Sequence, residues 1–154
     1  KIIMSESSSV SIKDNKKIQI RNSFIKEIDG AFKIFQTIED SVELQSVYNI
    51  FSILKTTNPE LLIRPFYEDF AKDFFNKIVP EIDVDFFLTY DIGEHIKRSV
   101  TTEHIHDAMI AFSNKTQLKL NSIHNNGSDA DKKTVDNLGK ILQKVVKLSN
   151  LYNK

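Results

Sequence analysis

Residues 129–152 read DADKKTVDNLGKILQKVVKLSNLY, and this stretch decides the fold class. Its apolar residues return every three or four positions, which is the period of one buried face of an α-helix. They are Val135, Leu138, Ile141, Leu142, Val145, Leu148, Leu151 and Tyr152. The preceding residues 125–128 form a loop signal, after which Ser128 or Asp129 can begin the helix. The chain is therefore predicted to close with a long amphipathic helix.

The same period recurs near the start of the chain. It predicts a first helix over residues 14–37 and a second that begins after Asp40 or Ser41. Gly30 lies inside the first helix, where we expect another helix to cross closely. The two apolar stripes comprise Phe24, Ile25, Ile28, Phe32 and Phe35, and then Leu44, Val47, Tyr48, Phe51 and Leu54. Residues 1–13 are polar and rich in serine, so a flexible arm is expected there.

Prolines punctuate the middle of the chain. Asn58-Pro59-Glu60 is typical of a helix start, because asparagine can cap the helix and proline fits its first position. Pro65 lies too deep for an unbroken helix, so a short turn is expected to give way there to a longer helix that stops before Pro80. Residues 81–98 are predicted to be the least regular part of the fold.

A further helix is expected to begin near Thr101 or Thr102. The scarcity of glycine (4) and proline (3) argues against a β-sandwich or barrel, which needs many tight turns. The sequence thus predicts an all-α fold with a single helical domain over residues 14–154. This domain is expected to be a bundle of about five to seven helices with one irregular segment near residues 81–98.

Charge is balanced in number but not in position. The 21 basic and 21 acidic residues differ from the basic excess typical of a dedicated nucleic-acid binder. Residues 60–94 contain nine acidic residues and three basic ones, whereas residues 13–33 and the tail after Lys132 lean basic. Two explanations stay open: solvated helix faces, or complementary packing between copies or against a charged partner.

The chain lacks the linear signatures of common enzymes. Zero cysteines exclude disulfides, thiolate zinc sites and a cysteine nucleophile, and suit a reducing compartment. There is no phosphate-binding glycine loop, serine elbow, kinase signature or dinucleotide fingerprint. We expect an intracellular, non-enzymatic protein with no membrane span, catalytic residue, cofactor or metal. An enzyme stays an alternative, since an active site can be assembled without a linear motif.

Three clusters were weighed as ligand sites. His104 and His106, with His95 nearby, lie two residues apart, so a regular helix points their rings about 200° apart. Residues 125–131 resemble part of a calcium loop, but aligning Gly127 with the sixth loop position places Lys133 where the glutamate is needed. A third cluster suits a hard cation or merely solubility: Asp83, Asp85, Asp91 and Glu94.

Two surfaces are candidates for binding macromolecules. The first is a row of phenylalanines, interpreted as core or as a partner surface: Phe66, Phe70, Phe74, Phe86 and Phe87. The second is a set of lysines on the last helix that could contact nucleic acid: Lys132, Lys133, Lys140, Lys144 and Lys147. Three of these lysines share one side of the helix at i, i+4 and i+7.

Three stretches carry a family resemblance. They are residues 57–63 (TNPELLI), residues 85–91 (DFFLTYD) and residues 145–152 (VVKLSNLY). In their order and spacing the chain resembles a group of small, largely uncharacterised helical proteins encoded by nucleocytoplasmic large DNA viruses. The resemblance implies a viral protein of the host cytoplasm or the virion, and it brings no catalytic residues.

The leading hypothesis is a non-enzymatic helical protein that acts through protein–protein contacts or self-association, as a virion or capsid-associated component. One alternative is a nucleic-acid-associated factor that uses the basic last helix. Another is an adaptor that mimics a host helical-bundle regulator by receiving a helix in a groove.

Overall fold

The computed structural model describes the backbone of residues 2–91, 94–95 and 103–154, and the side chains of residues 12–91, 94–95 and 107–154. All regular structure in these residues is helical, which confirms the all-α prediction. The helices are α1 (Ile2–Ile38), α2 (Val42–Thr57), α3 (Glu60–Phe66), the π-helical turn η1 (Tyr67–Ala71), α4 (Lys72–Ile78), α5 (Val84–Thr89), α7 (Glu103–Asn126) and α8 (Asp129–Tyr152). Since α3, η1 and α4 are continuous, the described residues form six helical segments, within the predicted number.

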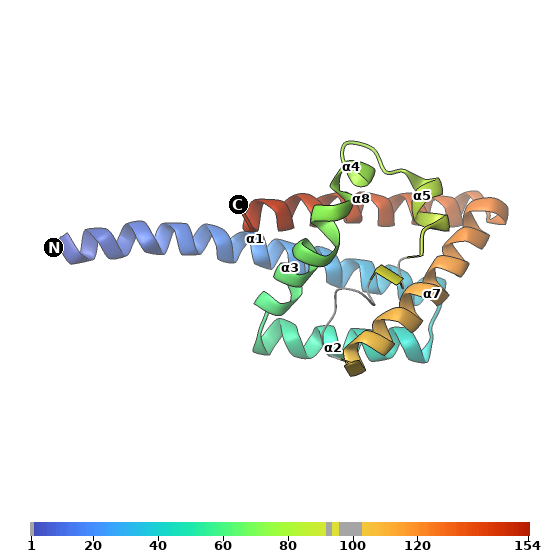
Figure 1. The fold of residues 1–154 in the computed structure, drawn as a ribbon, viewed down its shortest axis with the longest axis horizontal. Helices are drawn as coiled ribbons and strands as arrows, with labels where there is room; N and C mark the ends of the chain where they lie inside the picture. Colours follow the sequence, from blue (N-terminus) through green and yellow to red (C-terminus); the bar gives the residue numbers. More distant parts are fainter. Residues whose placement is uncertain (1, 92–93, 96–102) are drawn as a thin grey trace.

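The α1 and α8 helices form the most extensive helix pair of the bundle. They lie side by side and run in opposite directions, and the N-terminal half of α1 extends well past the end of α8 (Figure 1). Phe24 of α1 is buried with Val145 and Tyr152 of α8, and its ring meets that of Phe66 edge-on at 5.2 Å. Most of the stripe predicted for residues 129–152 is therefore buried, largely against α1, although Leu151 is exposed.

Two further core clusters complete the bundle. Phe32 of α1 packs with Phe51 of α2 at 5.1 Å between ring centroids, and Phe112 of α7 stacks on Phe32 at 6.2 Å. The third cluster lies between α4 and α8, where Ile78 and Val146 are fully buried. Burying side chains of this size stabilises the fold by about 1.5–3 kcal/mol each.

Side-chain caps fix where several helices begin. Ser41 Oγ accepts a hydrogen bond from the Leu44 N–H at 3.1 Å, and Ser128 Oγ accepts one from the Asp131 N–H at 3.2 Å. Both serines were predicted as helix starts, and both predictions are confirmed. Asn58 was expected to cap the next helix, but it closes α2 instead, because its N–H donates to the Leu54 carbonyl.

The start of the chain differs from its prediction. Residues 2–13 were expected to form a flexible arm, and the structure extends α1 through them. The physical reason is that residues 2–29 contain no proline or glycine, so nothing in the sequence ends the helix. The predicted close crossing at Gly30 is also wrong, because a Cβ built there meets nothing within 4 Å.

Pro65 was predicted to break the helix, but the helix continues through it. It lies inside α3, and the chain then makes one π-helical turn, η1, before α4 continues. Proline lacks the N–H that would bond to the Leu61 carbonyl. Because Leu61 is exposed, water can satisfy that carbonyl. The Tyr67 N–H then donates to both Ile63 and Arg64 carbonyls, which carries the helix past the gap.

The segment predicted as irregular contains more helix than expected. Within residues 81–98 the chain forms α5, whose first turn is capped by the Asp83 carboxylate accepting from the Phe86 N–H at 3.1 Å. Glu94 and His95 are helical as well, while residues 92–93 and 96–98 lie outside the described part. The predicted helix start near Thr101 or Thr102 also falls outside it.

Candidate interaction surfaces

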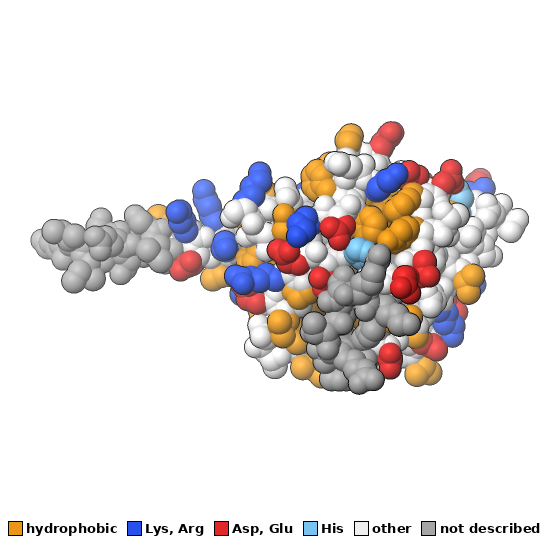
Figure 2. Space-filling model, in the orientation of Figure 1, with side chains coloured by type: hydrophobic (Ala, Val, Ile, Leu, Met, Phe, Trp, Pro, Cys, Tyr) orange, Lys and Arg blue, Asp and Glu red, His pale blue; other side chains and the backbone are white. Residues whose placement is uncertain are grey.

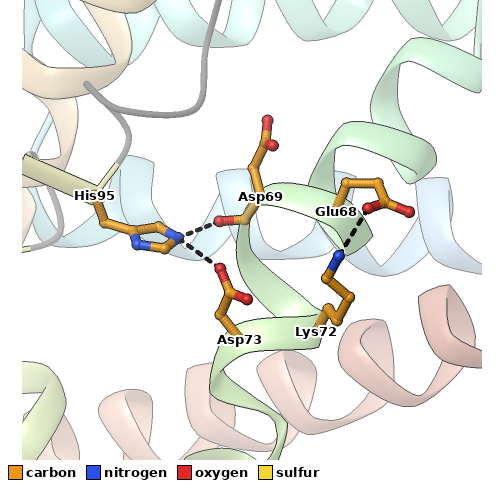
Figure 3. A network of polar contacts seen from close by, with 5 residues as sticks. All are labelled: Glu68, Asp69, Lys72, Asp73 and His95. Carbon is orange, nitrogen blue, oxygen red and sulfur yellow. Dashed lines mark hydrogen bonds and ion pairs between the residues drawn. The ribbon is translucent and has the colours of Figure 1, made fainter.

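His95 is held against η1 by polar and aromatic contacts (Figure 3). Its Nε2 N–H donates to the Asp69 carbonyl and lies 3.5 Å from the Asp73 carboxylate. Its ring packs edge-on against Phe74 at 4.7 Å, and the residue is only 8% exposed. The hydrogen bond from Nε2 to the Asp69 carbonyl and the contact with Phe74 together fix His95, and with it the neighbouring Glu94, against η1.

Asp69 lies in the same network but does not use its carboxylate there. Figure 3 shows that its carboxylate points away from His95, while its backbone carbonyl faces the ring. Burial raises the pKa of the Asp69 carboxyl, and the nearby His95 partly opposes that increase. Lys72 and Glu68 pair separately at 3.0 Å on the surface of the turn.

Two of the four carboxylates that suit a hard cation in the sequence, Asp83 and Asp91, have structural roles. Asp83 caps α5 and pairs with Lys77 at 3.6 Å, while Asp91 accepts from the Glu94 N–H at 2.9 Å. Within residues 12–91, 94–95 and 107–154, no three His, Asp or Glu side chains converge on one point. The side chains of His104 and His106 lie outside the described residues.

The phenylalanine row belongs mainly to the core. Phe74 is 7% exposed, and its centroid lies 5.1 Å from Phe70, 5.8 Å from Phe86 and 6.0 Å from Phe87. Phe66, Phe70, Phe86 and Phe87 are only partly buried. The row is thus a core cluster with accessible edges, and it joins α4 to α5.

Exposed acidic residues lie close in sequence to these accessible rings. Figure 2 shows an apolar patch on this face of the molecule, bordered by acidic side chains and by a basic one. Glu81, Asp85 and Glu94 are exposed and form no ion pair with any described residue. We call Phe70, Phe86, Phe87 and these three acids the acidic aromatic face.

The predicted lysine set of α8 is divided by the structure. Lys140, Lys144 and Lys147 are exposed, and Lys144 pairs with Glu27 of α1 at 3.5 Å. Lys132 and Lys133 lie in the first turns of α8, about 20 Å from Lys147 at 1.5 Å per residue. Three carboxylates accompany them there, from Asp129, Asp131 and Asp136. The set is therefore not one surface.

The α1 helix contributes a second group of basic residues. Their proximity to α8 could not be predicted from the sequence. The antiparallel pairing places Lys17 Nζ 5.0 Å from the centre of the Tyr152 ring. Lys13 and Lys16 are exposed and form no ion pair among the described residues. Lysine side chains consequently gather where α1 leaves the bundle (Figure 2). The basic run was visible in the sequence, but its place beside the end of α8 depends on tertiary packing.

Residues 12–19 of α1, which we call the basic arm, also carry exposed apolar groups. Every side chain from Ile12 to Gln19 is exposed, and packing begins only with Ile20. Ile12 is 60% exposed and Ile18 is 40% exposed. Apart from the contact of Lys17 with the Tyr152 ring, the basic arm therefore presents lysines and isoleucines to solvent, a composition that suits an interaction element.

One wide, open depression on the described surface lies at the start of α2, where its lining includes Asp40, Ser41 and Asn49. No described helix combines the length and apolar character that crossing a membrane requires. Comparison with protein families, curated proteins and solved structures found no match to this chain.

Proposed function

We propose that this protein acts through protein–protein contacts and not through catalysis, with the basic arm as its contact element. The observation that carries the proposal is the extension of α1 beyond the bundle, with all side chains of residues 12–19 exposed (Figure 1). The His95 network and the capping carboxylates have structural roles, which further supports a binding function.

The basic arm gains little stability from packing against the rest of the molecule. A single helix without tertiary contacts is marginal in water, because most helical stability in proteins comes from packing an apolar face. Covering Ile12 and Ile18 with a partner would bury apolar area and contribute about 25 cal/mol per Å² removed from water. Contact with a partner would therefore stabilise the arm.

Site-specific photo-crosslinking tests this proposal. A photoreactive side chain is placed at Ile12 or Ile18, and as a control at Asn137, which is exposed on α8 away from the arm. We expect adducts of discrete mass at positions 12 and 18, mapped to defined residues of a protein partner. Equal labelling at position 137, or no protein adduct at the arm, would contradict the proposal.

The viral setting is part of the same proposal. Its support is the resemblance carried by residues 57–63, 85–91 and 145–152 to helical proteins of large DNA viruses. A component of the particle should copurify with virions in fixed ratio to the capsid protein after treatment with protease and high salt. Quantitative proteomics of purified particles measures that ratio, and a protein found only in the infected cytoplasm would argue against a virion role.

A second candidate function is binding to nucleic acid through the lysines of α1 and α8. It is favoured by the gathering of Lys13, Lys16 and Lys17 beside a helix end that carries Lys147 and Lys154. Residues 137–154 contain no acidic residue. Fluorescence anisotropy with duplex and single-stranded DNA at low salt should then show binding that weakens with salt and on Lys147→Glu. Absence of binding at low salt rules this candidate out.

A further inference from the structure

We infer that the basic arm of one copy docks on the acidic aromatic face of a second copy, so that the protein associates head to tail. This inference rests on the proposed function and names its partner. It joins two surfaces of the same chain that carry charges without an ion pair among the described residues, one at the extending end of α1 and one along α4 and α5.

The arm supplies two lysines without an ion pair to a described residue and two exposed isoleucines, while its Lys17 lies over the Tyr152 ring. Lys13 and Lys16 form no ion pair among the described residues, and Ile12 and Ile18 remain exposed. Residues 12–19 contain three lysines and one acidic residue, Asp14. The arm is therefore a positively charged helix with two exposed isoleucines.

The acidic aromatic face offers the complementary groups. Of the nine acids between Glu60 and Glu94, only Glu60, Glu68, Asp73 and Asp83 form ion pairs with described residues. The face also presents partly buried aromatic rings, on which a lysine can lie. Lys77 Nζ already lies 4.8 Å from the centre of the Phe86 ring, which shows that the cluster accepts a cation.

One molecule cannot join these two surfaces by itself. The arm extends from the end of the bundle opposite to α5, so it lies far from the acidic aromatic face of its own chain (Figure 1). Contact between different patches on two copies gives a head-to-tail arrangement, which leaves one arm and one face free at its ends. Charge attraction would guide the encounter, and the isoleucines and ring edges would supply apolar contact.

Reciprocal charge reversal tests the inference in sedimentation equilibrium of the full 154-residue chain. The arm variant carries Lys13→Glu, Lys16→Glu and Lys17→Glu, and the face variant carries Glu81→Lys, Asp85→Lys and Glu94→Lys. The matched control changes three exposed lysines outside both surfaces: Lys119→Glu, Lys132→Glu and Lys133→Glu. Far-UV circular dichroism verifies that each variant keeps its helix content.

We expect the average mass of the wild type and the control to rise with concentration at low salt and to fall back at high salt. The arm variant alone and the face variant alone should each have an association constant at least tenfold lower than that of the wild type. Mixing the arm variant with the face variant should restore association, because the reversed arm then meets a reversed face. A monomeric wild type, an arm variant that associates normally, or a mixture that fails to associate would each overturn the inference.

Failure of this inference is distinguishable from failure of the proposed function. If crosslinks at positions 12 and 18 map to a different protein while the wild type stays monomeric, protein binding by the arm stands and self-association is overturned. If those positions crosslink only to nucleic acid, both are overturned.

Discussion

Gly30 and Gly127 differ in how much room each has for a side chain. A Cβ at Gly30 would meet nothing within 4 Å, whereas one at Gly127 would lie 2.5 Å from the Ile123 carbonyl oxygen. Gly30→Ala should raise the free energy of unfolding by about 1 kcal/mol, since alanine favours a helix interior. Gly127→Ala should lower it, because the backbone must shift. Urea unfolding measures both changes, and two changes of the same sign would contradict this account.

Asp69 should make stability depend on pH in a defined direction. Because burial raises the pKa of this carboxyl in the folded state, the folded protein holds its proton more tightly than the unfolded chain does. The resulting stabilisation is present at acid pH and is lost as pH rises through the folded-state pKa. Asp69→Asn removes the titration, so it should raise the urea midpoint relative to wild type at pH 7.

The Asp69→Asn advantage should shrink as pH falls below the usual range for aspartate. Asp136→Asn serves as the control, since Asp136 is exposed on α8. An Asp69→Asn gap that widens on acidification would show that burial does not dominate at this carboxyl.

At the scale of the helices, the serine caps should contribute measurably. Ser41 and Ser128 each accept a hydrogen bond from the N–H three residues later. Replacing either with alanine leaves that N–H without its side-chain partner and should cost about 1 kcal/mol. Ser122→Ala, at an exposed position inside α7, should be neutral or slightly stabilising. Chemical denaturation compares the three, and an equal loss at Ser122 would argue against a capping role.

Local signals explain which helices could be predicted from the sequence. The stripe of α8 and the caps at Ser41 and Ser128 depend on residues close in the chain. Both caps lie where the pattern indicated, whereas the stripe differs at Leu151, which is exposed, and at Val146, which is buried. The extension of α1 was missed because serine-rich composition was interpreted as disorder, although no residue there stops a helix. The continuation past Pro65 was missed because a π-turn has no simple sequence signature.

The candidate surfaces depended on information that no local pattern holds. The lysines of α8 were predicted individually, yet only the antiparallel packing of α1 shows that Lys17 lies beside Tyr152. For the phenylalanine row, the spacing allowed either core or surface. The ring contacts between Phe74 and Phe86 show that it is core with accessible edges.

For the whole molecule, the three core clusters should unfold as one unit. Phe24 and Phe32 place α1 in two of them, and Leu142 packs against both the first and the third. Far-UV circular dichroism reports helix content. Near-UV circular dichroism reports the packing of tyrosines that lie in all three clusters, among them Tyr48, Tyr90 and Tyr152. Their thermal midpoints should coincide, and two separated midpoints would show that one cluster unfolds independently.

The π-turn at residues 67–71 also sets how this segment tolerates changes in length. A regular α-helix advances 100° per residue, so side chains eight positions apart, such as Phe66 and Phe74, would point about 80° apart. The π-turn takes up one residue more than an α-helical turn, which lets both rings join one continuous row. Losing a single residue there would restore an ordinary helix and leave the flanking faces in phase. The same loss in the middle of α8 would rotate half of its buried stripe into water. Related chains that are one residue shorter or longer should therefore carry that difference at residues 67–71 and not in α8.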